Sequence, residues 1–301
     1  MSLDLFQQVQ GDVRFDEPMR RHNSFRIGGP ADVFVSPAHV DDLCTVLHAT
    51  HMHGMPVMTV GAGTNLLVSD EGVRGCVVKI GRGMGSMHHD GDLLTVGAGS
   101  PIARVARWAG DLSLSGLEFA EGIPGSVGGA IVMNAGAHGS DISRVVERVQ
   151  VADQIGNLVL LPQSHLKFGY RTSLIRTTQD LTVTAATFRL TADAPELIRE
   201  RMRAFGERRR RTQPLGKPCA GSVFKNPPGD YAARLIESCG LKGYRVNDAM
   251  VSTLHANFII NVGRAKAVDV MRLIETIRKR VLDDRGVYLQ LELEVIGLEG
   301  Y

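Results

Sequence analysis

Cysteine is scarce in this chain, and its few cysteines are far apart in the sequence. Among 301 residues there are four, Cys44, Cys76, Cys219 and Cys239, and no two of them form a C-x-x-C pair. This spacing argues against a disulfide framework and against a cysteine zinc site. We therefore expect free thiols, as in the reducing environment of a cytoplasm.

Long apolar runs and an excess of one charge are also missing. No run approaches the length of a membrane span, and the first residues lack the basic-then-apolar order of a signal peptide. The formal net charge is +2, which gives no general attraction to nucleic acid or to anionic membranes. With 44% hydrophobic and 22% charged residues, the composition is typical of a soluble globular protein. We expect a cytoplasmic protein without a nucleic-acid or membrane partner.

The hydrophobic pattern changes type along the chain, which predicts a mixture of helices and strands. Strands are expected at 31–37, 57–63, 75–80, 92–100, 146–153, 157–162, 181–191, 257–262 and 287–297. Helices are expected at 40–54, 101–114, 195–214, 231–240 and 265–286. We therefore predict an α+β fold with three domains, 1–80, 81–200 and 201–301.

Glycine is abundant, with 34 residues, and three glycine-rich stretches carry the strongest functional signal. VGAGTNLLVSD (60–70) follows a strand and offers successive N–H groups that suit a diphosphate. LEFAEGIPGSVGGAIVMNAGAHG (117–139) allows close approach to a flat or charged ligand, which Ser126 and Asn134 could orient. NSFRIGGPADVFV (23–35) adds a third glycine turn. Tight turns are the alternative for any one stretch, but three together favour a ligand. Neither GAGTN nor GAGSP completes G-x-G-x-x-G, which disfavours a nicotinamide-binding Rossmann domain.

The serine of CAGSVFKNPPG (219–229) fits neither of two motifs that it suggests. A hydrolase elbow reads G-x-S-x-G, but Ala220 and Phe224 stand where the outer glycines belong. The stretch also lacks the G-K-[ST] ending of a phosphate-binding P-loop. From the residues alone, Ser222 is most simply a turn residue.

Two clusters of charged or titratable residues are discounted. His48, His51 and His53 could bind a metal, but no carboxylate or cysteine completes a ligand set, so we expect solvated histidines and no metal. The run 208–211 is all arginine and could hold RNA or a phosphate. No aromatic residue is interleaved with it, so we expect a solvated helix end.

Five features occur in the order found in one enzyme family: NSFRIGGPADVFV, VGAGTNLLVSDEGVRG, GLEFAEGIPGSVGGAIVMNAGAHG, YRTS and GSVFKNPPG. With the ending GVYLQLELEVIG, they make most of the chain resemble the UDP-N-acetylenolpyruvoylglucosamine reductase (MurB) family. The resemblance implies a two-subdomain FAD-binding module of the PCMH or vanillyl-alcohol-oxidase-like kind, followed by a smaller α+β substrate-binding domain. It also implies a monomer that uses NADPH to reduce FAD. The reduced cofactor then serves to reduce the enolpyruvyl ether of a UDP-sugar in peptidoglycan synthesis.

The family's catalytic positions fall on three residues whose chemistry suits this reaction. Hydride reaches the terminal methylene carbon, so an enolate develops toward the carboxylate. Arg171, in YRTS, would stabilise that charge, and Glu292 would polarise the same group. Ser222 would donate the proton to the enolate carbon. The spacing G-V-x-L-x-x-E favours Glu292, with Glu294 as the other candidate. On the residues alone, a surface ion pair for Arg171 and an outward strand position for Glu292 are the ordinary alternatives.

The resemblance also assigns residues to the substrate and the cofactor. Asn226, Lys225 and Asn257 would contact the substrate, although Asn257 could equally be a satisfied amide at a strand end. The compact stretch between Tyr170 and Arg199 leaves no room for a substrate-tyrosine loop, so the chain resembles the shorter type of the family. The residues expected to hold FAD are Gly61, Ala62, Gly63, Thr64, Asn65, Leu66, Gly122, Ile123, Pro124, Gly125, Ser126, Gly128, Gly129, Asn134, Ala135 and Gly136.

Two other functions stay open beside this one. The first is another FAD-dependent oxidoreductase of the same fold, such as an oxidase of small alcohols. Such enzymes often tether the flavin through a histidine or cysteine near the glycine loops, and residues 60–70 contain neither. The second is a nucleotide-binding protein that keeps the cradle but has no redox activity.

Overall fold

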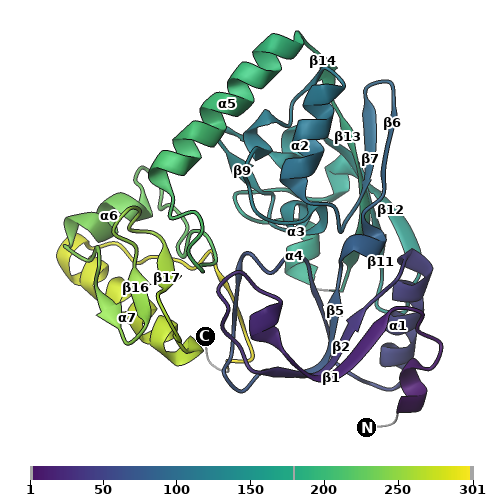
Figure 1. The fold of residues 1–301 in the computed structure, drawn as a ribbon, viewed down its shortest axis with the longest axis horizontal. Coiled ribbons are helices and arrows are strands. Elements are labelled where there is room, and N and C mark those ends of the chain that lie inside the picture. The colour runs from purple at the N-terminus through teal and green to yellow at the C-terminus, as the bar shows by residue number, and fades with distance from the viewer. Residues whose placement is uncertain (1–2, 179, 299–301) are drawn as a thin grey trace. The chain divides into compact units, whose positions relative to one another are not determined.

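The computed structural model describes residues 3–178 and 180–298, shown as a ribbon in Figure 1. The chain forms two compact units, each assembled from separate parts of the sequence. Unit 1 is drawn from Met1–Phe15, Val33–Ala62 and Gly75–Arg208. Unit 2 is drawn from Asp16–Asp32, Gly63–Arg74 and Arg209–Tyr301. The division into domains 1–80, 81–200 and 201–301 stays a prediction.

The two units contain both α-helices and β-strands. The α-helices are α1 (Val40–Met52), α2 (Ile102–Asp111), α3 (Val127–Val132), α4 (Leu174–Thr178), α5 (Pro195–Thr212), α6 (Ala232–Ser238) and α7 (Ala267–Arg285). The first strands are β1 (Asp12–Pro18), β2 (Pro30–Ser36), β3 (Val57–Val60), β4 (Leu66–Val68), β5 (Val73–Lys79), β6 (Met87–Asp90), β7 (Leu93–Gly97), β8 (Leu114–Ser115) and β9 (Gly136–Ala137). The remaining strands are β10 (Ser140–Asp141), β11 (Val146–Ala152), β12 (Leu158–Pro162), β13 (Thr182–Arg189), β14 (Thr191–Ala192), β15 (Arg245–Val246), β16 (Ala249–Val251), β17 (Ile259–Asn261) and β18 (Glu294–Ile296).

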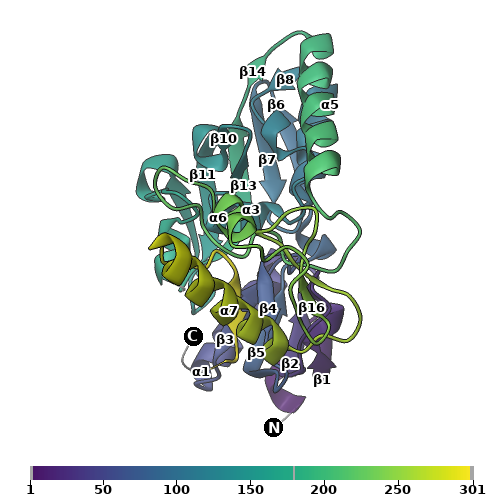
Figure 2. The ribbon, with the colours of Figure 1, turned by 90° about the vertical axis from the view of Figure 1, so that its left-hand side faces the viewer.

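Unit 1 is built around a five-stranded antiparallel sheet with the order β12-β11-β13-β7-β6. Helix α3 packs against its strand β13. Figure 2 shows β11, β13 and β7 side by side in this sheet. A four-stranded sheet has the order β1-β2-β5-β3, and β3 runs parallel to β5 with Val60 opposite Lys79. Apolar residues of unit 1 form one continuous core, which includes Leu94, Phe119, Ile131 and Phe188. The glycine turns at the end of β3 and before α3 therefore stand on a packed scaffold.

Helix α1 shows how local chemistry sets an element of unit 1. Asp42, in its first turn, is 2% exposed and its carboxylate accepts hydrogen bonds from the amides of Gln10, Gly11 and Ala38 at 2.9, 2.9 and 2.8 Å. A carboxylate at a helix start also suits the helix dipole. The helix then buries Leu43, Val46 and Leu47 at helical spacing.

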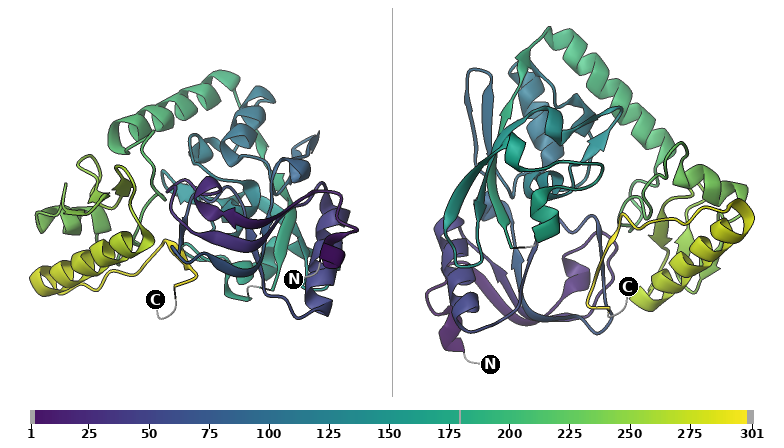
Figure 3. Two further views of the ribbon diagram at one scale, coloured as in Figure 1. Left: turned by 60° about the horizontal axis from the view of Figure 1, so that its bottom comes forward. Right: turned by 180° about the vertical axis from the view of Figure 1, so that it is seen from behind.

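Unit 2 has its own core between α6, α7 and a three-stranded sheet, β15-β16-β17. Helix α7, the long yellow-green helix in Figure 3, contacts β15 and β16. It ends at Gly286, whose φ of 69° provides the left-handed residue that often follows a helix. Two short strands, β4 and β18, pair in parallel. Phe25, Ile27 and Leu67 join the core formed by α6 and α7.

The single strand expected at 287–297 was wrong, because only β18 within it is a strand. The segment changes partner along its length. Gln290 accepts a hydrogen bond from the Lys225 amide at 2.9 Å, and the Glu292 amide donates to the Val223 carbonyl oxygen at 2.9 Å. Beyond that point β18 pairs with β4 instead. Alternating apolar residues led to the expectation of one strand, but they did not indicate two successive partners.

Candidate functional site

In unit 1, the end of strand β3 meets the start of helix α3. Gly61 directly follows β3, and a Cβ atom added there would lie 2.4 Å from the Ser126 hydroxyl oxygen. Ser126 is the N-cap of α3 and accepts a hydrogen bond from the Gly129 amide at 3.4 Å. Only glycine allows the loop to approach the helix this closely. Two of the stretches predicted to hold one cofactor are therefore neighbours.

The backbone at this contact can receive an anion. Within the part of the chain that the structure describes, the amides of Gly61 and Ala62 donate no hydrogen bond. Gly122 and Gly125, in the turn before α3, have φ values of 71° and 139°, which side chains avoid. Gly129 is exposed in the first turn of the helix. Unengaged amides in a glycine turn suit a phosphate, so this part of unit 1 fits the diphosphate of FAD.

Two residues predicted to hold the cofactor are engaged with the protein itself. A Cβ atom on Gly128 would lie 3.1 Å from the Cβ of Ala98, so this glycine permits close packing of α3. Asn134 is 4% exposed, and its Nδ2 donates to the Gly169 carbonyl oxygen at 3.0 Å. Its Oδ1 accepts from the Ser143 amide at 3.0 Å. A cofactor contact stays a prediction for both residues.

Arg171 lies at the tip of a tight turn in unit 1. The amide and carbonyl groups of Gly169 and Thr172 bond in both directions, at 3.1 and 3.3 Å, and enclose Tyr170 and Arg171. Arg171 has a φ of 56°, in the left-handed region that few residues other than glycine adopt. Its Nη2 donates to the Gly136 carbonyl oxygen at 3.1 Å. Strained backbone persists only where the surroundings hold it, so this turn fixes the direction of the guanidinium.

In unit 2, Ser222 lies on an extended segment that is held from both sides. The Val223 amide donates to the Asn257 carbonyl oxygen at 2.9 Å, and the Val223 carbonyl oxygen accepts from the Glu292 amide at 2.9 Å. Gly221, with a φ of 74°, bends the backbone just before the serine. In residues 3–178 and 180–298, the Ser222 hydroxyl has no hydrogen-bond partner. The backbone is fixed while the half-buried hydroxyl stays available.

The same unit brings Glu292 and part of the predicted cofactor loop to this segment. The Glu292 amide bonds to the Val223 carbonyl oxygen, next to Ser222. Glu294 instead begins β18, which pairs with β4. Asn65, in the loop before β4, donates from Nδ2 to the Glu292 carbonyl oxygen at 3.0 Å. Its own carbonyl oxygen accepts from the Glu294 amide at 3.0 Å. Residues far apart in sequence, all predicted as site residues, thus lie together.

The predicted substrate residues of unit 2 differ in their surroundings. Lys225 is half-buried, and Asn226 is exposed with its Oδ1 accepting from the Ala232 amide at the start of α6, at 3.1 Å. Asn257 is 4% exposed and its amide pairs with Phe224, accepting from its N–H at 2.9 Å and donating to its carbonyl oxygen at 2.8 Å. This geometry favours the satisfied amide for Asn257. A substrate contact stays a prediction for all three.

Some residues that shape the site were missing from the sequence analysis. In unit 1, Arg176 donates from Nη1 to the Arg171 carbonyl oxygen at 2.6 Å. In unit 2, the Ser24 hydroxyl donates to the Cys219 carbonyl oxygen at 2.6 Å. Ser24 stands within NSFRIGGPADVFV, a stretch that was singled out without any residue of it being assigned. Arg176 had no comparable signal beyond its place shortly after YRTS.

Cys219, shortly before Ser222, offers no competing nucleophile. Burial raises the pKa of its thiol, which outweighs a hydrogen bond with the Gly221 backbone that lowers it. The thiolate is the reactive form of cysteine. At neutral pH the thiol therefore stays protonated, and the polar chemistry of the segment belongs to the Ser222 hydroxyl.

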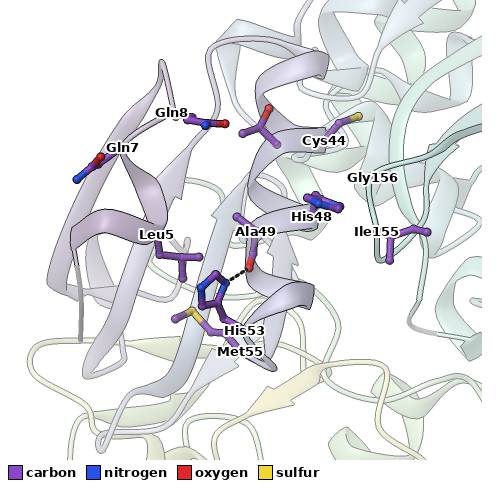
Figure 4. A pocket seen from close by; sticks show the side chains of 11 residues that line it. Leu5, Gln7, Gln8, Cys44, His48, Ala49, His53, Met55, Ile155 and Gly156 are labelled. Carbon is purple, nitrogen blue, oxygen red and sulfur yellow. Dashed lines mark hydrogen bonds between the residues drawn. The ribbon is translucent and has the colours of Figure 1, made fainter.

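A separate depression on unit 1 lies beside the discounted histidines. A shallow depression of about 890 Å³ around α1 is bordered by His48 and His53, two of the discounted histidines (Figure 4). His53 Nδ1 hydrogen-bonds the Ala49 carbonyl oxygen at 2.9 Å. Across residues 3–178 and 180–298, no three His, Cys, Asp or Glu side chains are placed to hold a metal ion. No helix in the same ranges is long and apolar enough to cross a membrane.

Two family models match the chain. The model of the UDP-N-acetylenolpyruvoylglucosamine reductase C-terminal domain matches residues 213–296. A model described as an FAD binding domain matches residues 31–161. The first range contains Ser222 and Glu292, and the second contains the loop after β3 and the turn before α3.

Proteins named UDP-N-acetylenolpyruvoylglucosamine reductase are similar over nearly the whole chain. The protein of Anoxybacillus flavithermus is 42% identical over 98% of this chain and 97% of its own length, and that of Bacillus subtilis is 40% identical over the same shares. The crystal structure of the enzyme (MurB) from Thermus caldophilus matches with a TM-score of 0.81 and 34% identity, covering 95% of this chain and 99% of that one. This chain therefore belongs to the UDP-N-acetylenolpyruvoylglucosamine reductase family and has its FAD-binding α+β fold.

Proposed function

We propose that this chain is an FAD- and NADPH-dependent reductase that converts UDP-N-acetylglucosamine enolpyruvate to UDP-N-acetylmuramate, a step in peptidoglycan precursor synthesis. The observation that carries the proposal lies in unit 2. There the Asn65 side chain donates to the Glu292 carbonyl oxygen, and the Glu292 amide bonds to Val223, next to Ser222. Among the residues that the structure describes, the Ser222 hydroxyl has no hydrogen-bond partner. This reduction requires an acid and a proton donor close to the cofactor, and Glu292, Ser222 and the Asn65 loop would supply that arrangement. The family membership supports the same function.

FAD would be held by the glycine turns described above. In unit 1, the amides of Gly61 and Ala62 and the turn Gly122–Gly125 would bind its diphosphate. Bound there, FAD would supply the hydride chemistry that links NADPH to the terminal carbon of the enolpyruvyl group. Any side chain at Gly61 would collide with Ser126, so this residue keeps the cradle open.

Arg171 would stabilise the negative charge that develops toward the substrate carboxylate. Its guanidinium stays protonated at any physiological pH and presents a planar fork of donors that matches a carboxylate. Because the turn between Gly169 and Thr172 fixes its backbone, the charge is oriented before the reaction begins. Preorganised charge of this kind is among the strongest contributions to catalysis.

Ser222 would supply the proton and Glu292 would polarise the enolpyruvyl group. The Ser222 O–H bond breaks as its proton moves to the carbon that bears the carboxylate, and water then returns a proton to the oxygen. An alcohol is a weak acid, but an enolate carbon is a strong base, so a positioned hydroxyl is sufficient. Lys225, Asn226 and Asn257 would contact the UDP-sugar. We further propose that the protein works as a cytoplasmic monomer of the shorter family type.

The visible spectrum of the purified protein tests the function. We expect flavin absorption that bleaches when NADPH is added without oxygen and returns when the enolpyruvyl sugar follows. A colourless protein that binds nucleotides would instead indicate a binding protein. Flavin that small alcohols bleach, but that the sugar does not reoxidise, would indicate an oxidase of the same fold.

A further inference from the structure

Two segments of unit 1, residues 132–136 and 169–176, are joined by side-chain hydrogen bonds. Each bond runs from a side chain to a backbone carbonyl oxygen, so each one fixes the path of the chain. The bonds are Asn134 Nδ2 to Gly169 O at 3.0 Å, Arg171 Nη2 to Gly136 O at 3.1 Å and Ser173 Oγ to Val132 O at 2.8 Å. The second segment is also braced internally, by Arg176 Nη1 on Arg171 O at 2.6 Å.

Asn134 is well placed to hold the Gly169 carbonyl rigidly. It is 4% exposed, and its Oδ1 accepts from the Ser143 amide at 3.0 Å while its Nδ2 donates to Gly169. Both ends of the amide are thus engaged, and the side chain has no freedom to turn. Its own φ is 42°, a left-handed value that asparagine tolerates better than most residues.

The direction of the Arg171 side chain depends on the orientation of the Gly169 carbonyl. This carbonyl accepts a second hydrogen bond from the Thr172 amide, at the longer distance of 3.3 Å, which closes the turn. Without the Asn134 donor, that long bond alone would hold the carbonyl against a strained Arg171 with a φ of 56°. A peptide that rotates there changes the direction in which the guanidinium leaves the turn.

We infer that Asn134 is a positioning residue for Arg171, acting through the Gly169 carbonyl, and that this is its main contribution to the reaction. The inference rests on the proposed function, since it assigns Asn134 to the step in which Arg171 takes part. It differs from the cofactor contact predicted for Asn134, because a positioning residue leaves flavin binding and flavin reduction by NADPH unchanged. The two roles therefore separate in experiment.

The variant Asn134→Asp tests the inference with little change of shape. Aspartate also tolerates a left-handed φ and keeps the acceptor for Ser143, but it places an oxygen opposite the Gly169 carbonyl where a donor stood. In stopped-flow measurements we expect reoxidation of the reduced flavin by the enolpyruvyl sugar to slow about 10- to 100-fold, as for a misplaced catalytic group. Flavin content should be that of the unmodified protein, and flavin reduction by NADPH should stay within about twofold.

A double-mutant cycle adds a readout that a merely structural role would not move. If Asn134 acts through Arg171, Asn134→Asp should slow the sugar half-reaction by less than about twofold when Arg171→Ala is already present. The matched control is Asn157→Asp. Asn157 is exposed in unit 1 and its Nδ2 donates to the Asp153 carboxylate at 3.0 Å. Its substitution should change neither half-reaction.

The outcomes separate the inference from the proposed function. Loss of flavin, or equal slowing of both half-reactions, would make Asn134 a cofactor contact and overturn the inference, as would additive losses in the cycle. If Asn134→Asp does not fold, Asn134→Gly keeps the left-handed backbone without strain and should show the same split. An unmodified protein that the sugar fails to reoxidise refutes the proposed function. An active protein with an unaffected Asn134→Asp variant refutes the positioning role alone.

Discussion

The segments that contain Arg171 and Ser222 are held in different ways. In unit 1, Arg171 lies in a strained turn, and side chains tie that turn to neighbouring carbonyl groups. In unit 2, Ser222 lies on extended backbone, and main-chain hydrogen bonds through Val223 hold the segment from both sides. Asn257 is the main side-chain contribution there, through its pairing with Phe224.

The difference follows from what each group would do. A guanidinium stabilises a developing negative charge only when it points toward that charge. It therefore benefits from a backbone that neighbouring residues hold in place. A proton donor must release its proton during the reaction, and a protein partner for its hydroxyl would compete with the substrate. The Ser222 hydroxyl accordingly has none among the described residues. Substitutions at the two sites should therefore have different costs for folding.

Ser222→Ala should have the largest effect on activity and almost none on folding. Removal of a positioned acid costs about 10²- to 10⁴-fold in rate, and we expect this loss only when the enolpyruvyl sugar reoxidises the flavin. The melting temperature should stay within about 1 °C, since no protein hydrogen bond is lost and a surface-type change costs little.

Arg171→Ala is the matching change on the other side of the comparison. It should slow the same half-reaction and also lower the melting temperature, because the hydrogen bond from the guanidinium to the Gly136 carbonyl oxygen is lost. Stopped-flow rates and thermal melts measured on both variants decide the matter. Equal slowing of both half-reactions by Ser222→Ala would remove its role as proton donor.

Glu292→Gln and Glu294→Gln form a pair that fixes the position of the acid. Glu292 pairs beside Ser222, whereas Glu294 lies on β18 beside β4. We expect Glu292→Gln to lower turnover about 10- to 100-fold with flavin still bound, and Glu294→Gln to change it less than about threefold. Steady-state rates together with flavin absorbance measure both. The reverse order would move the acid to Glu294, and protein without flavin would make the residue structural.

Much of this arrangement could be predicted from the sequence because its signals are local. Helices α1, α2, α5, α6 and α7 were each expected from the sequence, and the structure confirms them. The glycines at 61, 122 and 125 follow from conformations and close approaches that exclude side chains. The proposed catalytic residues came from the family resemblance, since an arginine, a serine and a glutamate carry little signal alone.

Other features depend on tertiary contacts that no local pattern encodes. Helix α3 lies in a glycine-rich stretch, where each interior glycine costs about 1 kcal/mol relative to alanine, but the Ser126 cap and packing against β13 hold it. The role of Asn134 depends on the approach of residues 169–176. The segment 287–297 changes partner between Val223 and β4. The sequence did not indicate these partners, and it did not predict helix α3.

Asn257→Leu tests the backbone pairing on the Ser222 side. Leucine is close in size but leaves the N–H and C=O of Phe224 without their partners, and Phe224 is 1% exposed. An unsatisfied buried polar group costs about 1–3 kcal/mol, so we expect a loss of roughly 2–4 kcal/mol in the free energy of unfolding measured with urea. The control Asn226→Ala removes a bond at an exposed position and should cost less than about 1 kcal/mol. Equal losses would mean that the Asn257 amide does not hold the segment.

The smallest expected effect concerns a cluster of charged side chains in unit 1. Glu118 stands at the start of the glycine-rich stretch of unit 1 and is 7% exposed. Arg201 donates to its Oε1 from Nη2 at 2.8 Å, and the Gly116 amide donates to its Oε2 at 2.7 Å. Burial alone would raise the pKa of this carboxyl, but hydrogen bonds from backbone amides, Ser115 and Arg201 outweigh it and lower the pKa from 4.5.

A carboxyl whose pKa is lower in the folded than in the unfolded state stabilises the protein above the unfolded value. That contribution is lost as the pH falls below about 4.5 and through the folded pKa. Glu118→Gln should therefore cost about 1.5–3 kcal/mol at pH 7, as for a hydrogen bond to a charged group, and flatten the fall of the melting temperature between about pH 5 and pH 3. Because Ser222 depends on backbone pairing instead, the Asn257→Leu variant should keep the full acid dependence. A Glu118→Gln protein whose melting temperature falls with pH as in the unmodified protein would show that the Glu118 charge does not contribute to this acid dependence.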